Sequence, residues 1–287
     1  MKAPAFDYAR PASLDETFAL MARHGDDARL LAGGQTLLAT LNMRLSEPAL
    51  LIDINRIDAL KGITVEGDML RIGALATHRQ IEESPLVARH APLLTMAAPY
   101  IAHRAIRNRG TFGGSIAYAD PAAEWPVCLA VLEGFVVVRD RDGERRIAAK
   151  DFFIDLYTTD LREGELITAC ELPIATDADV FAFEELARRH GDYAIVGLAV
   201  AARRGAAGIS RMRLCYLGMG TVPVRPAHTE VLLEDKALTT DTIDAAIASL
   251  KTELDPMGDL TNTAETKRHL ACVLARRALT SVMETTA

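Results

Sequence analysis

Two pairs of adjacent glycines, about eighty residues apart, are the part of this 287-residue chain best suited to chemistry. The first lies in segment 32–36, Ala-Gly-Gly-Gln-Thr, and the second in segment 111–115, Thr-Phe-Gly-Gly-Ser. Adjacent glycines leave backbone N–H groups free of side-chain obstruction, and hydroxyl residues stand beside each pair, so both segments could bind phosphate. Either pair alone is also typical of a tight turn. Together, without a complete GxGxxG or GxxxxGK[ST] motif, they predict a diphosphate site outside the Rossmann and P-loop types.

A third glycine-rich segment begins like a dinucleotide-binding fingerprint. Its sequence over residues 218–223 is Gly-Met-Gly-Thr-Val-Pro. That fingerprint requires a helix to start within it, and Pro223 and Pro226 prevent one from starting there. We therefore predict a loop over 218–223.

The composition excludes several classes of partner. The formal net charge is −7, and nucleic-acid phosphates need clustered Lys and Arg, so we expect no nucleic-acid partner. No run approaches 18 uncharged apolar residues and residues 1–10 lack an apolar signal core, which predicts a cytoplasmic protein without a membrane span. Four arginines close together in the second half are better explained as a solvated strand edge: Arg203, Arg204, Arg211 and Arg213.

The cysteines and histidines give no metal-binding pattern. Cys128, Cys170, Cys215 and Cys272 are far apart with no CxxC spacing, and the seven histidines form no HxxxH or HxH pair. We expect reduced, buried thiols and no zinc or iron–sulfur site on this chain. Any redox chemistry therefore needs an organic cofactor.

The first glycine segment is expected between a short buried strand at 29–32 and a helix over 36–45. The positive end of that helix would then face anything bound by the glycines. A capping box at 13–16 predicts a preceding helix that ends at Gly25, and 50–54 has the composition of a second strand.

The second glycine segment is expected as a loop among short helices. Alternation around a Gly-Asp turn predicts a hairpin over 63–72. A capping box at 77–80 begins a helical stretch to about residue 107, which prolines must divide at Pro85, Pro92 and Pro99. After the glycines we expect an irregular stretch at 117–126, a helix at 127–132, a hairpin over 135–148 and a strand at 165–172.

The pattern changes after a proline-containing stretch at 173–179, which is typical of a linker. Three β-rich segments follow, and then two helices with apolar stripes. This order predicts a compact antiparallel sheet with helices packed on it, an α+β arrangement. The segments are 181–186, 194–203 and 212–218 for the strands, and 242–254 and 263–283 for the helices.

Four segments in this order carry a family resemblance that covers essentially the whole chain. They are 32–37 (AGGQTL), 106–115 (IRNRGTFGGS), 120–126 (DPAAEWP) and 188–194 (RRHGDYA). Together they closely resemble the FAD-binding medium subunit of the molybdenum hydroxylases, the group that contains carbon monoxide dehydrogenase and the flavin portion of xanthine dehydrogenase.

The resemblance implies an α+β fold with two domains. Residues 1–175 would form a two-part FAD-binding domain of the p-cresol methylhydroxylase and vanillyl-alcohol oxidase type, with sub-parts at about 1–57 and 58–175. Residues 179–285 would form a smaller C-terminal domain, like that of carbon monoxide dehydrogenase flavoproteins, an antiparallel sheet with helices that closes over the flavin.

The resemblance also implies which residues bind FAD. Glu124 would contact the polar edge of the flavin or its ribityl chain; otherwise it is a surface helix cap. Tyr193 would lie near the isoalloxazine ring; otherwise it is a half-buried strand tyrosine. Ile167 lies on a strand whose backbone would touch the flavin. The pyrophosphate would be held by residues of both glycine segments, namely Ala32, Gly33, Gly34, Gln35, Thr36, Thr111, Gly113, Gly114 and Ser115.

Some positions depart from the carbon monoxide dehydrogenase branch. Ala39 and Asn42 stand where that branch has a proline and a lysine after the first glycine segment. Glu184 and Glu185 replace a lysine near the pyrimidine edge of the flavin. These differences leave FAD binding intact as an expectation, but they weaken carbon monoxide as substrate and leave the flavin potential and the acceptor (NAD, a quinone, a cytochrome or oxygen) open.

The function implied is that of an oxidoreductase flavoprotein, the electron-transfer medium subunit of a heterotrimeric molybdenum hydroxylase. A large subunit would carry molybdopterin and the substrate pocket, a small one the [2Fe-2S] clusters, and two heterotrimers would pair as a heterohexamer. Electrons would pass singly from the clusters to this FAD and on to a terminal acceptor. No residue here would then be catalytic toward the organic substrate. The alternatives are a stand-alone flavin oxidase or dehydrogenase, with His190 as candidate base, and a flavin-less assembly or ligand-binding protein.

Overall fold

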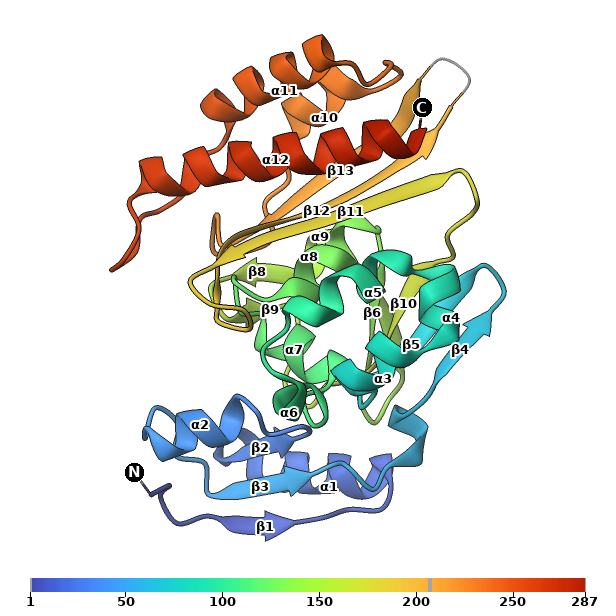
Figure 1. The fold of residues 1–287 in the computed structure, drawn as a ribbon. Coiled ribbons are helices and arrows are strands. Elements are labelled where there is room, and N and C mark those ends of the chain that lie inside the picture. The colour runs from blue at the N-terminus through green and yellow to red at the C-terminus, as the bar shows by residue number, and fades with distance from the viewer. Residues whose placement is uncertain (1, 206–207, 287) are drawn as a thin grey trace.

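The computed structural model describes residues 2–205 and 208–286, which form three units arranged one above another (Figure 1). The N-terminal unit, at the base of the figure, is a parallel sheet with the strand order β1-β3-β2. Ser13 caps its first helix by accepting the N–H of Glu16, and Gly25 ends that helix, as predicted. The elements are β1 (Asp7–Ala9), α1 (Leu14–His24), β2 (Ala28–Leu31), α2 (Leu37–Asn42) and β3 (Leu50–Asp53).

The middle unit is built on a five-stranded antiparallel sheet with the order β4-β5-β10-β6-β7. Its strands are β4 (Ile63–Glu66), β5 (Met69–Gly73), β6 (Phe135–Arg139), β7 (Glu144–Ala148) and β10 (Leu166–Pro173). A small hairpin of β8 (Phe153–Asp155) and β9 (Thr158–Thr159) lies at its side. Both predicted hairpins, over 63–72 and 135–148, are present.

Short helices surround that sheet because prolines interrupt the helical stretch. Pro85 and Pro92 stand at the first positions of α4 and α5, where a missing N–H costs nothing. Thr77 and Gln80 form the predicted capping box of α3. The helices are α3 (His78–Glu83), α4 (Pro85–His90), α5 (Pro92–Ala97), α6 (Arg104–Arg107), α7 (Phe112–Tyr118), α8 (Glu124–Val131) and α9 (Ala149–Phe152).

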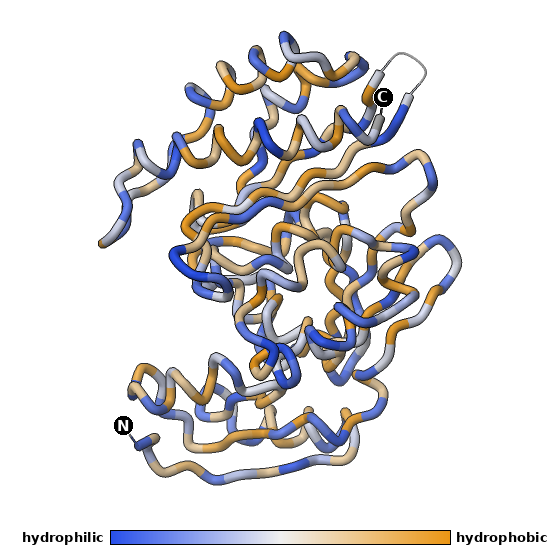
Figure 2. The backbone as a smooth tube through the Cα atoms, in the orientation of Figure 1, coloured by the Kyte–Doolittle hydropathy of each residue, from blue (hydrophilic) through white to orange (hydrophobic). Residues whose placement is uncertain are grey.

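The C-terminal unit is an antiparallel sheet with the order β11-β12-β13, covered on its upper face by helices (Figure 1). Its strands are β11 (Asp179–Ala187), β12 (Ala194–Arg204) and β13 (Ile209–Leu217), and its helices are α10 (Ala227–Leu233), α11 (Thr240–Glu253) and α12 (Ala264–Thr286). Hydrophobic and hydrophilic residues alternate along α11 and α12, as expected of helices with one buried side (Figure 2).

The central strand β12 is buried on both faces. Leu198 and Val200 pack into the core beneath the C-terminal helices, whereas Ala199 and Ala201 belong to the core of the middle unit, together with Cys128 of α8. A strand covered on both sides must be apolar at consecutive positions, which explains why residues 194–202 are an apolar run without alternation.

Several local predictions are wrong. The second glycine pair lies inside α7 and not in a loop, and α8 begins at Glu124 and not at residue 127. Helix α2 is shorter than the predicted 36–45, and β1 and α10 were not predicted at all.

The solvated strand edge predicted for the arginines of the second half is wrong for Arg213. Its side chain on β13 is only 15% exposed and forms an ion pair with Glu133 of the middle unit. Arg203 is paired as well, since its Nε lies 2.8 Å from Asp179 Oδ1.

The four cysteines are free and buried, as predicted. Among the described residues, no helix combines the length and apolar character needed to cross a membrane.

Candidate cofactor-binding site

A cavity of about 320 Å³ opens where the N-terminal unit meets the middle unit. Both glycine segments contribute to its wall, although they are far apart in the sequence. The remaining lining comes from the ends of β1 and β3, from the residue that caps α3 and from the segment just before Thr111. The lining residues are Arg10, Ala32, Gly33, Asp53, Asn55, Thr77, Asn108, Arg109 and Thr111.

The two glycine segments touch backbone to backbone at this cavity. A Cβ atom on Gly33 would lie 2.2 Å from the carbonyl oxygen of Arg109 and 2.8 Å from the Cα of Gly110. No side chain fits into such a contact, so the first segment needs glycine at this position for the two segments to meet.

The first segment presents free backbone donors. Among the described residues, the N–H groups of Gly33, Gly34, Gln35 and Thr36 donate to no backbone or side-chain acceptor. Gly34 has φ +71°, a conformation that glycine adopts without strain, and its carbonyl accepts the N–H of Leu38 as α2 begins. Consecutive unpaired N–H groups are the donors that bind a phosphate anion.

The second segment does not have free N–H groups at its glycines. Gly113 donates to the carbonyl of Ala74 at 2.9 Å, and Gly114 donates to Thr111 Oγ1 at 3.2 Å. Gly113 instead allows close packing, because a Cβ there would lie 2.5 Å from the Cβ of Ala74. Ser115 is half-buried and its N–H donates to the carbonyl of Thr111. Thr111 is therefore the residue of this segment that lines the cavity.

Asp53 and its neighbours were not predicted from the sequence. Asp53 accepts hydrogen bonds from Tyr8 Oη and from Asn55 Nδ2, the latter at 2.6 Å. Burial opposes its ionisation, but these hydrogen bonds outweigh burial and lower the pKa of Asp53. Arg10 Nε lies 3.5 Å from Asp53 Oδ2. The cavity thus holds a carboxylate for hydroxyl groups beside two arginines, Arg10 and Arg109, for anions.

Asn55 ties this carboxylate to the first glycine segment, since its Nδ2 also donates to the carbonyl of Ala32 at 2.8 Å. The only sequence signal for the group was an Asp at the end of a buried strand, followed two residues later by an Asn.

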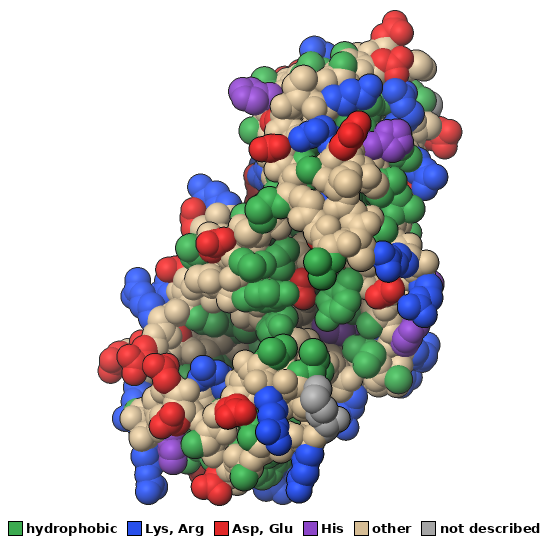
Figure 3. Space-filling view, turned by 90° about the vertical axis from the view of Figure 1, so that its left-hand side faces the viewer, with side chains coloured by type: hydrophobic (Ala, Val, Ile, Leu, Met, Phe, Trp, Pro, Cys, Tyr) green, Lys and Arg blue, Asp and Glu red, His purple; other side chains and the backbone are tan. Residues whose placement is uncertain are grey.

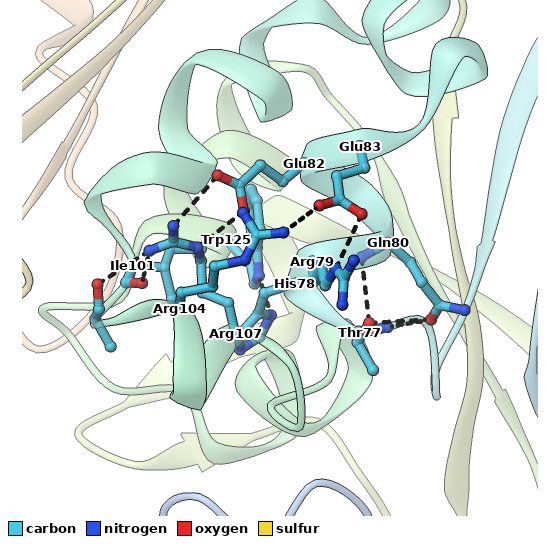
Figure 4. Close-up of polar contacts among 11 residues, drawn as sticks. Thr77, His78, Arg79, Gln80, Glu82, Glu83, Ile101, Arg104, Arg107 and Trp125 are labelled. Atoms are coloured by element: carbon cyan, nitrogen blue, oxygen red, sulfur yellow. Dashed lines mark hydrogen bonds and ion pairs between the residues drawn. The ribbon is translucent and has the colours of Figure 1, made fainter.

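A neutral histidine supports the second segment from behind. His78 Nδ1 accepts the indole N–H of Trp125 at 2.9 Å (Figure 4). Burial, assisted by the charge of Arg107, lowers the pKa of His78 to about 4. Gly110 lies against this ring, because a Cβ there would be 2.5 Å from His78 Nε2. The neutral imidazole therefore packs against Gly110, next to the contact between the two glycine segments.

Two carboxyl groups with raised pKa values lie close to each other, one at the start of α8 and the other on β11. Burial raises the pKa of Glu124 to about 7, and the charge of Asp120 adds to this. Burial raises the pKa of Glu185 to about 9, and the charge of Glu124 adds to that. Glu185 Oε2 is buried and has no hydrogen-bond partner among the described residues. Glu124 is half-buried at the first position of α8, so both its contact with the flavin and its alternative role as a helix cap stay predictions.

Three tyrosines lie close to Asp120: Tyr118, Tyr157 and Tyr193. The rings of Tyr118 and Tyr157 are 5.0 Å apart. Burial raises the pKa of Tyr157 to about 12, and Asp120, Tyr118 and Tyr193 add to the shift. Tyr193 is 71% exposed and directly precedes β12, so the half-buried strand tyrosine considered as an alternative is wrong.

The surface around β8 and β9 is apolar. Ile154, Leu156 and Tyr157 of this hairpin are all exposed, and Figure 3 shows a band of apolar side chains across the middle of the face on which β8 and β9 lie. Ile167 is not on this surface; it is buried in β10 beside a register shift in the sheet. A planar aromatic ring would find apolar and tyrosine surface here, and partly neutral carboxyls beside it.

The residues present fit FAD. The free N–H groups of the first glycine segment and two arginines suit a diphosphate, the ionised Asp53 suits hydroxyl groups, and the unpartnered Glu185 Oε2 indicates a polar partner supplied from outside the chain. Of the residues predicted from the sequence, the structure brings Ala32, Gly33 and Thr111 together at one cavity. Glu124 and Tyr193 form a separate group near the C-terminal sheet.

Comparison with known proteins agrees with this site. Residues 4–175 match the family model described as the FAD binding domain in molybdopterin dehydrogenase, and residues 181–282 match that of the CO dehydrogenase flavoprotein C-terminal domain. The chain is 38% identical over 284 residues to the 6-hydroxypseudooxynicotine dehydrogenase complex subunit alpha of Paenarthrobacter nicotinovorans, an alignment that covers 99% of this chain and 96% of the relative.

Two solved structures have the same fold. Carbon monoxide dehydrogenase from Hydrogenophaga pseudoflava superposes with a TM-score of 0.96 at 36% identity, covering 100% of both chains. Quinoline 2-oxidoreductase from Pseudomonas putida 86 superposes with a TM-score of 0.95 at 33% identity, covering 100% of this chain and 99% of the other. The predicted α+β class, an FAD-binding domain followed by a C-terminal domain, is confirmed.

Proposed function

Since the chain belongs to the family of FAD-binding subunits of molybdopterin-dependent dehydrogenases, we propose that it carries electrons between partner subunits and a terminal acceptor through a bound FAD. The family predicted from the four sequence motifs is confirmed, and the chain is an FAD-binding oxidoreductase subunit of a multi-subunit enzyme. In our proposal a large subunit holds molybdopterin and oxidises the substrate, and a small subunit holds [2Fe-2S] clusters. We further propose a cytoplasmic dimer of heterotrimers, with domains at 1–175 and 179–285 and a division near residue 57.

The observation that carries the proposal is the meeting of the two glycine segments at one cavity, with four unpaired N–H groups on the first segment. A diphosphate would accept from these groups at Gly33, Gly34, Gln35 and Thr36. Thr111 of the second segment also lines the cavity, and the arginines Arg10 and Arg109 would offset the negative charge.

The other residues are proposed to orient the rest of the cofactor. Asp53 would accept from hydroxyl groups, and Glu124 and Tyr193 would lie toward the ring. The backbone of the strand that carries Ile167 would touch the flavin. When bound, FAD supplies the capacity to take up electrons one at a time and release them singly or in pairs. The chain's own residues would hold the cofactor and limit its exposure to water, and none of them needs to act as an acid or base on the organic substrate.

The test is to express the chain alone and together with its partners. Alone, it should purify with the visible absorbance of FAD but should not oxidise a purine, an aldehyde or carbon monoxide with an artificial acceptor. Activity should require the large and small subunits. Turnover by the isolated, metal-free chain would instead favour a stand-alone flavin oxidase, and a colourless chain that cannot take up FAD would refute the proposal.

A further inference from the structure

Arg107 is a buried arginine at the end of α6, and its guanidinium donates hydrogen bonds to a carboxylate and to two backbone carbonyls. Its Nε and Nη2 atoms lie 2.9 and 3.3 Å from the two carboxylate oxygens of Glu82 on α3. Its Nη1 donates to the carbonyl oxygens of Ile101 and Ala102, both at 3.1 Å (Figure 4). The planar fork of a guanidinium spreads its donors over three nitrogens, which lets it reach a carboxylate and two carbonyls at once, whereas the three donors of a lysine ammonium share one nitrogen.

The segment that Arg107 holds is in an uncommon conformation. Ala102 has φ +42°, in the left-handed region, although it is not glycine. Such a conformation persists only where surrounding contacts impose it. The two hydrogen bonds from Arg107 to the carbonyls of Ile101 and Ala102 are such contacts, and they fix where the Ala102 carbonyl points.

The Ala102 carbonyl lies against the loop at 188–193, which joins β11 to β12. A Cβ on Gly191 would lie 2.7 Å from the oxygen of Ala102 and 2.9 Å from His103 Nδ1. Gly191 itself has φ +77°, and Arg188, Arg189 and His190 are exposed. The loop therefore packs closely against the middle unit at Gly191, two residues before Tyr193.

We propose that Arg107 is a positioning residue for Tyr193, acting through the carbonyl of Ala102 and the backbone of Gly191, with Glu82 as its counter-ion. The chain of contacts crosses from the middle unit to the loop of the C-terminal unit. The inference rests on the proposed function only in taking Tyr193 to lie against the flavin. The control of loop 188–193 by Arg107 depends only on contacts within the chain and not on FAD.

The test compares Arg107→Lys with Arg104→Lys, a matched control on the same helix. Arg104 is an exposed partner of Glu83, with its Nη2 2.7 Å from Glu83 Oε1, and it does not contact the 101–102 carbonyls. Amide hydrogen exchange is measured over 188–194 in the full chain without FAD. We expect Arg107→Lys to accelerate exchange there by about tenfold and Arg104→Lys to leave it unchanged.

The flavin supplies a second readout that loss of stability alone would not change. In the FAD-loaded chain, Arg107→Lys should shift the visible spectrum and the reduction potential in the same direction as Tyr193→Ala. In the double variant, Arg107→Lys should add nothing, because the ring that it positions is absent. Glu82→Gln, which keeps the volume and removes the counter-charge, should give the same changes more weakly if Arg107→Lys does not fold.

The outcomes separate the two proposals. Exchange at 188–194 that stays at the wild-type rate in both Arg107→Lys and Glu82→Gln would overturn the inference, as would fully additive effects of Arg107→Lys and Tyr193→Ala on the flavin. Failure of the wild-type chain to bind FAD would refute the proposed function, while the exchange comparison would still decide whether Arg107 controls the loop.

Discussion

Replacing Gly33 with alanine should weaken FAD binding strongly while changing only one methyl group. The new Cβ would lie 2.2 Å from the carbonyl oxygen of Arg109, and Cβ atoms essentially never approach other atoms closer than 3.0 Å. The backbones of the two glycine segments must therefore separate by roughly 1 Å, because tightly packed backbone cannot absorb the overlap.

A displacement of roughly 1 Å is large compared with the range of donor–acceptor distances over which a hydrogen bond forms. An N–H group that donates to a phosphate at about 2.8 Å is moved beyond the range of roughly 3.2 Å in which such bonds are effective. A hydrogen bond to a charged group is worth about 1.5–3 kcal/mol. Losing one of the donors in the first segment should thus raise the dissociation constant of FAD by about ten- to a hundredfold.

The assay is a titration of the FAD-free chain with FAD, followed by flavin fluorescence, alongside thermal unfolding of the FAD-free chain. Gly143→Ala is the matched control, because an added Cβ there meets no atom within 4 Å and Gly143 is not in the left-handed region. Wild-type FAD affinity in Gly33→Ala would refute the reasoning. So would an equal loss of affinity in Gly143→Ala.

Three further outcomes are expected. Gly113→Ala, whose Cβ would lie 2.5 Å from that of Ala74, should lower the free energy of unfolding of the FAD-free chain by about 1–3 kcal/mol, measured by denaturant titration; unchanged stability would contradict the packing role. Glu124 and Glu185 have pKa values of about 7 and about 9, raised above those of the unfolded chain, so they stabilise the fold below about pH 4.5 and that contribution is lost as the pH rises toward 9. Glu185→Gln should therefore flatten the decline of unfolding free energy between pH 5 and 9, and an unchanged slope would show that the carboxyl is not held neutral. Tyr193→Ala removes a 71% exposed ring, so it should cost no more than about 0.5 kcal/mol and leave FAD bound, but change the flavin spectrum and potential; a wild-type spectrum and potential would show that the ring has no role toward the flavin.

Local sequence signals predicted the elements of this fold well. Pro85, Pro92 and the capping residue Thr77 each act on their own neighbours, as does the turn of the hairpin predicted over 135–148. Their effects can therefore be inferred without the tertiary structure. The strand and helix on either side of Gly33 and Gly34 were also predicted, because those residues have clear strand and helix patterns. Gly33 lines the cavity, and the binding of phosphate by these glycines stays a prediction.

The features that could not be predicted depend on partners far away in the sequence. The role of Gly113 depends on Ala74, and Arg213 forms its ion pair with the distant Glu133. Burial opposes the ionisation of Asp53, and the hydrogen bond from Tyr8 helps to lower its pKa. Gly113 and Gly33 are both glycines beside another glycine, yet Gly113 packs against Ala74, just after β5, whereas Gly33 touches the loop at Arg109. Composition and spacing cannot distinguish these two reasons for a glycine, because both require only the absence of a side chain.

The two buried faces of β12 have a consequence for how the chain unfolds. Because Ala199 and Ala201 complete one core and Leu198 and Val200 another, the middle and C-terminal units cannot lose their cores independently. The N-terminal unit has its own core around Phe18 and Ile52, to which the middle unit contributes a few residues such as Leu75 and Leu166. The chain is thus one large cooperative block with a smaller and separable one attached, and a ligand bound across the Gly33–Arg109 contact would join the two into a single unfolding transition.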